Sequence, residues 1–258
     1  MLGSVLITAA TSALALSIVK GSEWGWSSAR VVGLLMFTVV GTGFLARRIS
    51  GHADPILPLP LLAIPSFRVA ISSLFLFGLG FFSSMLVVVL YLTEMAGYST
   101  VRTGFGVSVL ATMAFTTANF SGRLADRFGH RRIAVPGMCS FILGCLWLYQ
   151  NAGANPSFFV DVFPALVLMG VGIGSGPTLL SAAAVSEVDP SNFSVAGAVA
   201  QTARQLSGAI GISIAVAISG SNADEDAFRA TFLYLTIVVA MAAIAALKLP
   251  AANATRKL

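Results

Sequence analysis

The amino-acid sequence predicts an all-α membrane protein whose transmembrane helices are separated by short polar turns. Only 10% of its 258 residues are charged and 57% are hydrophobic, whereas a soluble domain usually carries about 25% charged residues. The apolar residues form stretches long enough to cross a bilayer, which takes about 20 residues in a helix. One dense basic run, Gly122 to Arg132, separates two uncharged stretches. This pattern is typical of a helix bundle surrounded by lipid.

Apolar stretches of this length recur along the whole chain. The segments between them carry turn and interface signals, among them Trp24, Trp26, a proline-rich segment from Pro55 to Pro65, and Asp189-Pro190. Tryptophan at such places is typical of the bilayer surface. We therefore predict eight transmembrane helices. Their ranges are 2–19, 29–46, 69–92, 104–121, 133–150, 158–179, 195–219 and 229–249.

The distribution of basic residues predicts how these helices are oriented. If the run 122–132 faces the cytoplasm, ten Lys and Arg residues lie on that side and four on the other, with Arg204 inside a span. This asymmetry fits the positive-inside rule. We expect a multi-pass protein of the cell (plasma or inner) membrane with both termini in the cytoplasm. The ten are Arg47, Arg48, Arg68, Arg123, Arg127, Arg131, Arg132, Lys248, Arg256 and Lys257, and the four are Lys20, Arg30, Arg102 and Arg229.

Several classes of function are excluded. The net charge of +5 comes from short basic turns between apolar spans, which predicts contact with an anionic lipid surface and no nucleic-acid binding. Cys139 and Cys145 lie about 240° apart around a helix, so we interpret both as buried packing residues and expect neither a disulfide nor a metal clamp. His52 and His130 both lie in turns. We predict no metal site, no cofactor and no enzyme.

The run from Gly122 to Arg132 is the first candidate functional segment. Its glycines allow close helix approach and a tight turn, and Asp126 can accept hydrogen bonds from a guanidinium or from a helix N-terminus. Two interpretations remain open: an ionic latch that holds helix groups together in one state, or a solvated loop that only sets the orientation. The candidate gating residues are Gly122, Asp126, Arg127, Gly129, Arg131 and Arg132.

A second candidate is the polar face of the span 195–219. An arginine in mid-span costs roughly 2.5–3.5 kcal/mol even on the lenient insertion scale, so Arg204 should face the bundle interior or water and have a partner. We predict that Arg204, Gln201 and Gln205 line a substrate path, with interhelical hydrogen bonding as the alternative. Small and polar residues recur here at three- and four-residue steps, which indicates one helix face. They are Gly197, Gln201, Arg204, Gln205, Gly208 and Gly211, and we interpret the glycines as packing residues.

Two further spans carry packing signals. The stripe of Ser108, Thr112, Thr116 and Asn119 predicts interhelical hydrogen bonds. A glycine-rich run from 170 to 177 lacks the third glycine of a dinucleotide-binding loop, and it predicts a closely packed helix, with a hinge as the alternative. The residues of this run are Gly170, Gly172, Gly174, Gly176 and Pro177.

Two acidic residues lie near the predicted outer ends of their spans. For Glu94, a surface charge is one interpretation, because an acid at a span end reaches the interface at little cost. A proton or cation site at an external gate is the other. We interpret Asp161 as a surface charge.

Together these motifs resemble the major facilitator superfamily. The pattern Gly122-x-Leu124-Ala125-Asp126-Arg127-x-Gly129, followed by basic residues, is similar to its loop signature. Other stretches resemble its fourteen-span drug:proton antiporter branch, of EmrB/QacA type, in the same order over about Gly21 to Ser213. These stretches are Trp24–Ser28, Pro55–Leu59, Gly97–Ser99 ahead of Gly104, and Arg204–Gly211. The sequence departs from the pattern at His130, where a Lys or Arg is usual, and at Glu94, where Gln is frequent.

The resemblance implies that residues 1–52 hold two accessory helices, 66–250 the C-terminal six-helix bundle, and 251–258 a cytoplasmic tail. It implies proton-coupled efflux of small amphipathic compounds or drugs by alternating access, with an N-terminal six-helix half as a necessary partner. That half, which is missing here, would have to supply the proton-coupling acid, because no carboxylate lies in mid-span. The alternative is a truncated or split fragment that does not transport alone and acts at most as a membrane partner subunit.

Overall fold

The computed structural model describes residues 9–10, 12–14, 16–18, 20–21, 24–50, 61, 63–153, 156–219 and 224–249, without the side chains of 42 and 45–50. Its elements are all helices, and the described residues form no strand. The long helices are α2 (Ala29–Ser50), α4 (Pro65–Leu90), α5 (Thr100–Phe128), α6 (His130–Asn151), α7 (Phe163–Val185), α8 (Phe193–Ser219) and α9 (Glu225–Ala246). The short ones are two π-helical turns, η1 (Tyr91–Met95) and η2 (Phe158–Val162), and the 3₁₀ turn η3 (Pro190–Asn192).

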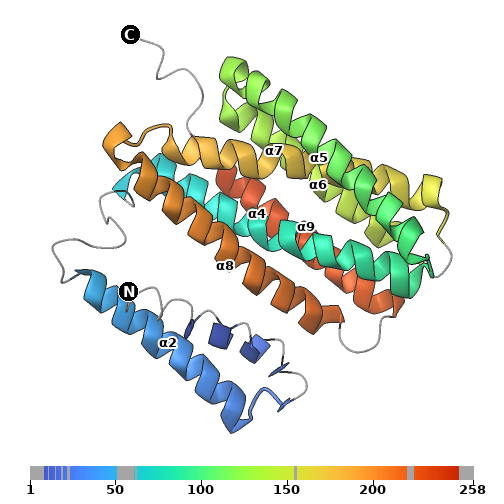
Figure 1. Ribbon diagram of the computed structural model, residues 1–258, viewed down its shortest axis with the longest axis horizontal. Coiled ribbons are helices and arrows are strands. Elements are labelled where there is room, and N and C mark those ends of the chain that lie inside the picture. Colours follow the sequence, from blue (N-terminus) through green and yellow to red (C-terminus); the bar gives the residue numbers. More distant parts are fainter. Residues whose placement is uncertain are drawn as a thin grey trace.

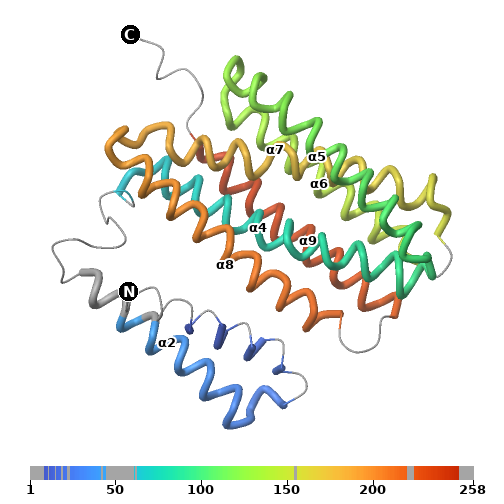
Figure 2. Tube along the Cα trace, in the orientation of Figure 1, coloured from blue at the N-terminus to red at the C-terminus, as the bar shows by residue number. Residues whose placement is uncertain are grey.

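The helices α4 to α9 form a bundle with α4 and α7 at its centre. α4 packs against α7, α8 and α9, while α7 packs against α5 and α6, and α6 also contacts α9. In Figures 1 and 2, α5 and α8 run along opposite edges with α4 and α7 between them. Among the described residues, none of these helices packs extensively against α2. The six-helix bundle is therefore the part of the chain that positions the candidate site.

Glycines allow α7 to lie against three neighbouring helices at once. A Cβ built on Gly170 would lie 2.8 Å from the carbonyl oxygen of Leu110 in α5, and one on Gly172 would lie 2.7 Å from a backbone oxygen of α6. Gly174 repeats the contact with α5 one turn later, and Gly176 faces an aromatic ring of α4. Since real side chains do not tolerate such separations, these positions need glycine for close backbone approach.

The packing of α8 on α4 uses glycine in the same way. A Cβ on Gly211 would lie 2.5 Å from the carbonyl oxygen of Leu79, and one on Gly208 would lie 3.0 Å from the ring of Phe82. By contrast, nothing lies within 4 Å of a Cβ built on Gly197. Among the glycines of this face, Gly208 and Gly211 are thus packing residues and Gly197 is not.

The long helices differ in how well their length and apolarity suit them to cross a membrane. Among the described residues, the segments with the length and apolarity to cross a membrane are Pro65–Met95, His130–Asn151, Phe158–Val185 and Glu225–Ala246. α5 and α8 have 29 and 27 residues, which is long enough, but both are too polar to meet the same criterion. The chain is therefore a multi-pass helical membrane protein, while the count of eight spans stays a prediction. Most of the predicted span 2–19 lies outside the described residues.

The prediction of a loop over 122–132 is wrong. α5 continues to Phe128 and α6 begins at His130, so only Gly129 separates the two helices. Gly129 has φ 91°, a conformation that a residue without a Cβ adopts at little cost. The basic run remains helical because arginine, leucine and alanine are good helix formers even where the helix leaves the apolar layer.

π-helical turns mark the other end of the two central helices. η1 extends α4 by five residues and contains Glu94, and η2 precedes α7 and contains Asp161. The predicted boundary of the span 158–179 changes accordingly, since the α-helix proper starts at Phe163 and continues to Val185. Such turns are rare and often occur at functional sites.

An aromatic clasp joins two connections at this end of the bundle, which is the predicted outer end. The Tyr98 hydroxyl, after η1, donates a hydrogen bond of 3.0 Å to the carbonyl oxygen of Pro156, before η2. The guanidinium of Arg102 lies 3.8 Å from the centroid of the Tyr98 ring. The clasp therefore ties the α4–α5 connection to the α6–α7 connection.

A polar tie occupies the opposite, predicted cytoplasmic end. The buried Ser66 hydroxyl at the start of α4 donates a hydrogen bond to the carboxylate of Glu187, between α7 and η3. Two residues on, Asp189 caps η3 by accepting hydrogen bonds from the backbone N–H of Ser191, at 2.9 Å, and from its hydroxyl, at 2.5 Å. These hydrogen bonds lower the pKa of the Asp189 carboxyl below its ordinary value.

Candidate functional site

The polar residues of α8 occupy adjoining faces instead of the single face predicted from their spacing. Gln201 and Gln205 are exposed, Arg204 is partly buried, and Ser207 and Gly208 are buried against α4. Successive helix positions differ by about 100°, which places Arg204 at the boundary between the packed face and the exposed amides. The two glutamines therefore face away from the contact with α4.

Arg204 lies near the middle of its helix. It is eleven residues after Phe193 and fifteen before Ser219, about 17 Å and 22 Å along the helix axis. Its guanidinium makes no ion pair or hydrogen bond with any described residue, and its own carbonyl oxygen accepts a hydrogen bond of 2.7 Å from the Ser207 hydroxyl. The partner that Arg204 was predicted to have is thus not found in the described part of this chain. The described carboxylates all belong to helix ends or connections.

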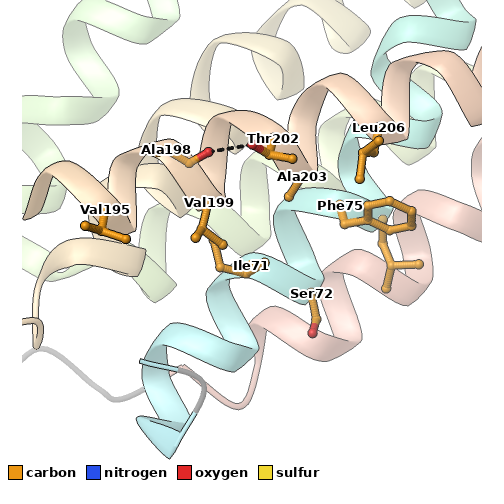
Figure 3. Close-up of a pocket in the computed structure, with 10 residues that line it drawn as sticks. Ile71, Ser72, Phe75, Val195, Ala198, Val199, Thr202, Ala203 and Leu206 are labelled. Atoms are coloured by element: carbon orange, nitrogen blue, oxygen red, sulfur yellow. Dashed lines mark hydrogen bonds between the residues drawn. The ribbon is translucent and has the colours of Figure 1, made fainter. Parts of the chain in front are cut away.

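A groove that is not predicted from the sequence lies between α4 and α8. Figure 3 shows its walls, which come from α4 and α8. Its volume is about 630 Å³. The lining residues are Ile71, Ser72, Phe75, Leu76, Val195, Ala198, Val199, Thr202, Ala203 and Leu206. The predicted polar path residues Gln201, Arg204 and Gln205 are not among them.

The polar stripe of α5 makes no interhelical hydrogen bonds within the described chain, so the predicted partners of these side chains are not found there. Ser108 donates to the carbonyl of Phe105 and Asn119 to that of Phe115, while Thr116 donates to its own helix one turn back. Ser108, Thr112, Thr116 and Asn119 are all exposed. The register of α5 puts Leu110, Met113 and Ala114 against α7. It leaves the hydroxyl and amide side chains facing away from the bundle, on the exposed side that also carries Phe105 and Phe115.

The acidic residues at the predicted outer end lie in different surroundings. Glu94 is exposed on η1, with no hydrogen bond or ion pair to a described residue. The Asp161 carboxylate accepts a hydrogen bond of 2.7 Å from the backbone N–H of Ser157, which orders the start of η2. Arg229 forms an ion pair of 2.6 Å with Glu225. The structure therefore does not bring Glu94 together with Arg204 or the amides of α8.

The residues of the candidate latch form no ion pair in the described part of the chain. Asp126 is exposed and pairs with no described residue, so it does not bond to Arg127, Arg131 or Arg132. The guanidinium of Arg127 lies 5.4 Å from the ring centroid of Phe128. A Cβ on Gly122 would meet nothing within 4 Å, so the expected close helix approach does not occur there among the described residues.

Both cysteines were predicted to be buried, and this prediction is wrong for one of them. Cys145 is buried, but Cys139 is exposed on the surface of α6. No group of three or more His, Cys, Asp or Glu side chains that could hold a metal ion occurs in the part of the chain that the structure describes.

Three features are not predicted from the sequence: the clasp at Tyr98, the tie at Ser66 and the groove. Each joins residues far apart in the chain, and the hydrogen bond between Ser66 and Glu187 spans 121 positions. One signal was available for the tie: Glu187 stands in a connection without Lys or Arg, on the side where basic residues dominate.

Comparison with known proteins identifies relatives of this bundle. The chain is 26% identical over 212 residues to a tetracenomycin C resistance and export protein of Streptomyces glaucescens, with 82% of this chain and 39% of the relative covered. It is 25% identical over 217 residues to the multidrug resistance protein Stp of Mycobacterium tuberculosis, with 82% and 39% covered. It is 26% identical over 225 residues to a methylenomycin A resistance protein of Streptomyces coelicolor, with 87% and 47% covered.

This chain thus spans less than half the length of these curated relatives. The sequence model of the Major Facilitator Superfamily matches residues 70–258, which include all of α5 to α9 and most of α4. The match covers most of the chain and the whole region that carries the polar faces of α5 and α8. The chain therefore belongs to the Major Facilitator Superfamily, a family of membrane transporters.

Proposed function

We propose that this chain is the C-terminal part of a secondary active transporter that exports small amphipathic compounds by alternating access. Its six-helix bundle would rock against an N-terminal six-helix half around a site near the bilayer midplane. The relatives support the export direction, because they are named for drug resistance and, in one case, for export. The cell membrane, with both chain ends in the cytoplasm, is the proposed location.

The exposed polar stripe of α5 is the observation that carries this proposal. Ser108, Thr112, Thr116 and Asn119 point away from the bundle that α5 belongs to. A membrane helix does not favour hydroxyl and amide groups against lipid, and such residues usually face a protein interior or a water-filled cavity. A second helical bundle with an aqueous path between the halves supplies that surrounding. This chain matches 39% and 47% of the length of two relatives, which fits the assignment to one part of a longer transporter.

Proton coupling is part of the proposal and places a requirement on the absent half. Arg204 is the central charge on α8, and the described acids lie towards the helix ends. The acid that carries the proton through mid-membrane would therefore belong to the N-terminal half. Asp126 and the arginines around it would form the latch with that half in one state and release it in the other.

A second candidate function is a split or truncated product that does not transport alone and serves at most as a membrane partner subunit. Asp126 and Arg204 pair with no residue in the described part of the chain, which favours a need for such a partner. This candidate differs from the first in what it requires, because a partner subunit need not contribute residues to the substrate path.

One efflux experiment separates these candidates. Cells lacking their own exporters would express this chain alone, a candidate N-terminal half alone, or the two together or fused. Accumulation of a fluorescent amphipathic compound would be followed with and without a proton uncoupler. We expect efflux only when both halves are present, and its loss with the uncoupler. No efflux from any combination at normal membrane abundance would contradict the transporter proposal.

A further inference from the structure

We infer that Arg204 is the binding position for the anionic group of an exported amphipathic compound, a carboxylate or a chemically equivalent oxyanion. This inference rests on the proposed function and deepens it, because it assigns a charge class to the substrate. It follows from the charge balance around the middle of the bundle and from the donors that surround Arg204.

The described bundle places one charge deep in the membrane and leaves it without a counter-charge. Arg204 is the one charged residue found near the middle of any described helix from α4 to α9, whereas the acidic residues there lie close to helix ends or connections. A guanidinium stays protonated in proteins, and the attraction between opposite charges grows as the surrounding dielectric constant falls. The mid-membrane region of this half therefore has a positive potential that favours an anion.

The groups next to Arg204 are suited to hold an oxyanion. Gln201 and Gln205 are exposed, and their side-chain amides make no hydrogen bond with a described residue, so their N–H groups remain available as donors. The hydroxyls of Thr202 and Ser207 already donate to backbone carbonyls of α8. A planar guanidinium matches the two oxygens of a carboxylate, and a neighbouring glutamine amide can donate to an oxygen from the side.

The rival explanation is a carboxylate of the N-terminal half that neutralises Arg204 within the protein. The two explanations predict different selectivity. If a protein carboxylate is the partner, replacing Arg204 leaves a buried acid without its cation, and transport of every substrate falls together. If the substrate anion is the partner, replacing Arg204 reduces transport of the acid and spares a neutral analogue.

The test uses a matched pair of fluorescent probes, 1-pyrenebutyric acid and its carboxamide, in cells that express this chain with its N-terminal half. Efflux of each probe would be measured for the parent, Arg204→Gln, Arg204→Lys and Thr202→Ala. Thr202 serves as the control because it lies on the groove flank of α8. Quantitative immunoblotting and a detergent-solubilised size-exclusion profile would establish that each variant is folded and present at parental abundance.

We expect Arg204→Gln to lower the ratio of acid to amide efflux by about tenfold or more, the effect of losing one charge-assisted hydrogen-bond partner. Arg204→Lys should restore part of the ratio because it keeps the charge, and Thr202→Ala should leave the ratio unchanged. An equal fall for both probes in a folded variant, or no change in the ratio, would overturn the inference and leave the proposed function standing. If the parent assembly exported neither probe, both the inference and the proposed function would be overturned.

Discussion

Gly170 of α7 lies so close to Leu110 of α5 that a Cβ on the glycine would stand 2.8 Å from the leucine carbonyl oxygen. We predict that Gly170→Ala destabilises the bundle by about 1–3 kcal/mol, because overpacking a tight contact forces the backbones apart. Gly197→Ala is the matched control, since nothing lies within 4 Å of its added Cβ and alanine favours the helix by about 1 kcal/mol. Unfolding of the purified variants in mild detergent measures both. Equal stability of the two would show that α5 and α7 do not meet in this way.

The tie between Ser66 and Glu187 gives a second prediction. Ser66→Ala removes the donor of this hydrogen bond and should lower stability by about 1 kcal/mol, with Glu187 exposed and therefore still able to bond to water. Ser72→Ala, on the same helix but exposed in the groove, is the control and should have a smaller effect. Thermal unfolding of the two variants in the same detergent compares them. A larger loss from Ser72→Ala would refute the tie.

The cap at Asp189 gives a prediction about pH. Hydrogen bonds from Ser191 lower the pKa of Asp189, so the cap stabilises the folded connection above the unfolded pKa and is lost as the pH falls through the folded pKa. In Ser191→Ala the hydroxyl donor is gone, so the pKa of Asp189 should rise and the cap should be lost at a higher pH. Hydrogen exchange of residues 186–193, compared between parent and variant across the acidic range, measures this. Coincident pH profiles would rule out a role for the Ser191 hydroxyl.

The proposed latch gives a prediction about kinetics. Asp126→Asn keeps the size of the side chain but removes its charge, so it should slow the exchange between inward- and outward-facing states in the assembled transporter. The control is Asp226→Asn, an exposed acid at the start of α9. Single-turnover efflux from proteoliposomes measures the exchange rate. Rates identical to the parent in Asp126→Asn would remove the latch interpretation.

Much of the fold is predictable from this sequence because bilayer length and apolarity constrain a membrane helix strongly. The spans predicted at 133–150, 158–179 and 229–249 lie close to α6, α7 and α9. The end of α5 was not, since charged residues end the apolar layer but do not end a helix, and only the backbone of Gly129 does so. Likewise, π-helical turns such as η1 leave no signal in hydropathy.

The sequence is enough to predict which residues belong to the candidate site, but not which helix face each one occupies. Spacing alone put the amides of α8 and Gly208 on one face, whereas the contact with α4 divides them, because helix steps of three and four residues cover a wide arc. For α5, the sequence shows a polar stripe but not the direction in which it faces. That direction depends on which side of the helix packs against α7, and this is a property of the tertiary structure.

The central claim is that the polar face of α5 packs against a second bundle instead of lipid. A photo-crosslinking amino acid, p-benzoylphenylalanine, in place of Thr112 tests this in membranes that contain this chain and its N-terminal half, with the same substitution at Leu143, an exposed apolar residue of α6, as the control. Our account predicts a covalent adduct between the two halves from position 112 and none from position 143. Adducts of position 112 with lipid alone, or equal adducts from both positions, would contradict it.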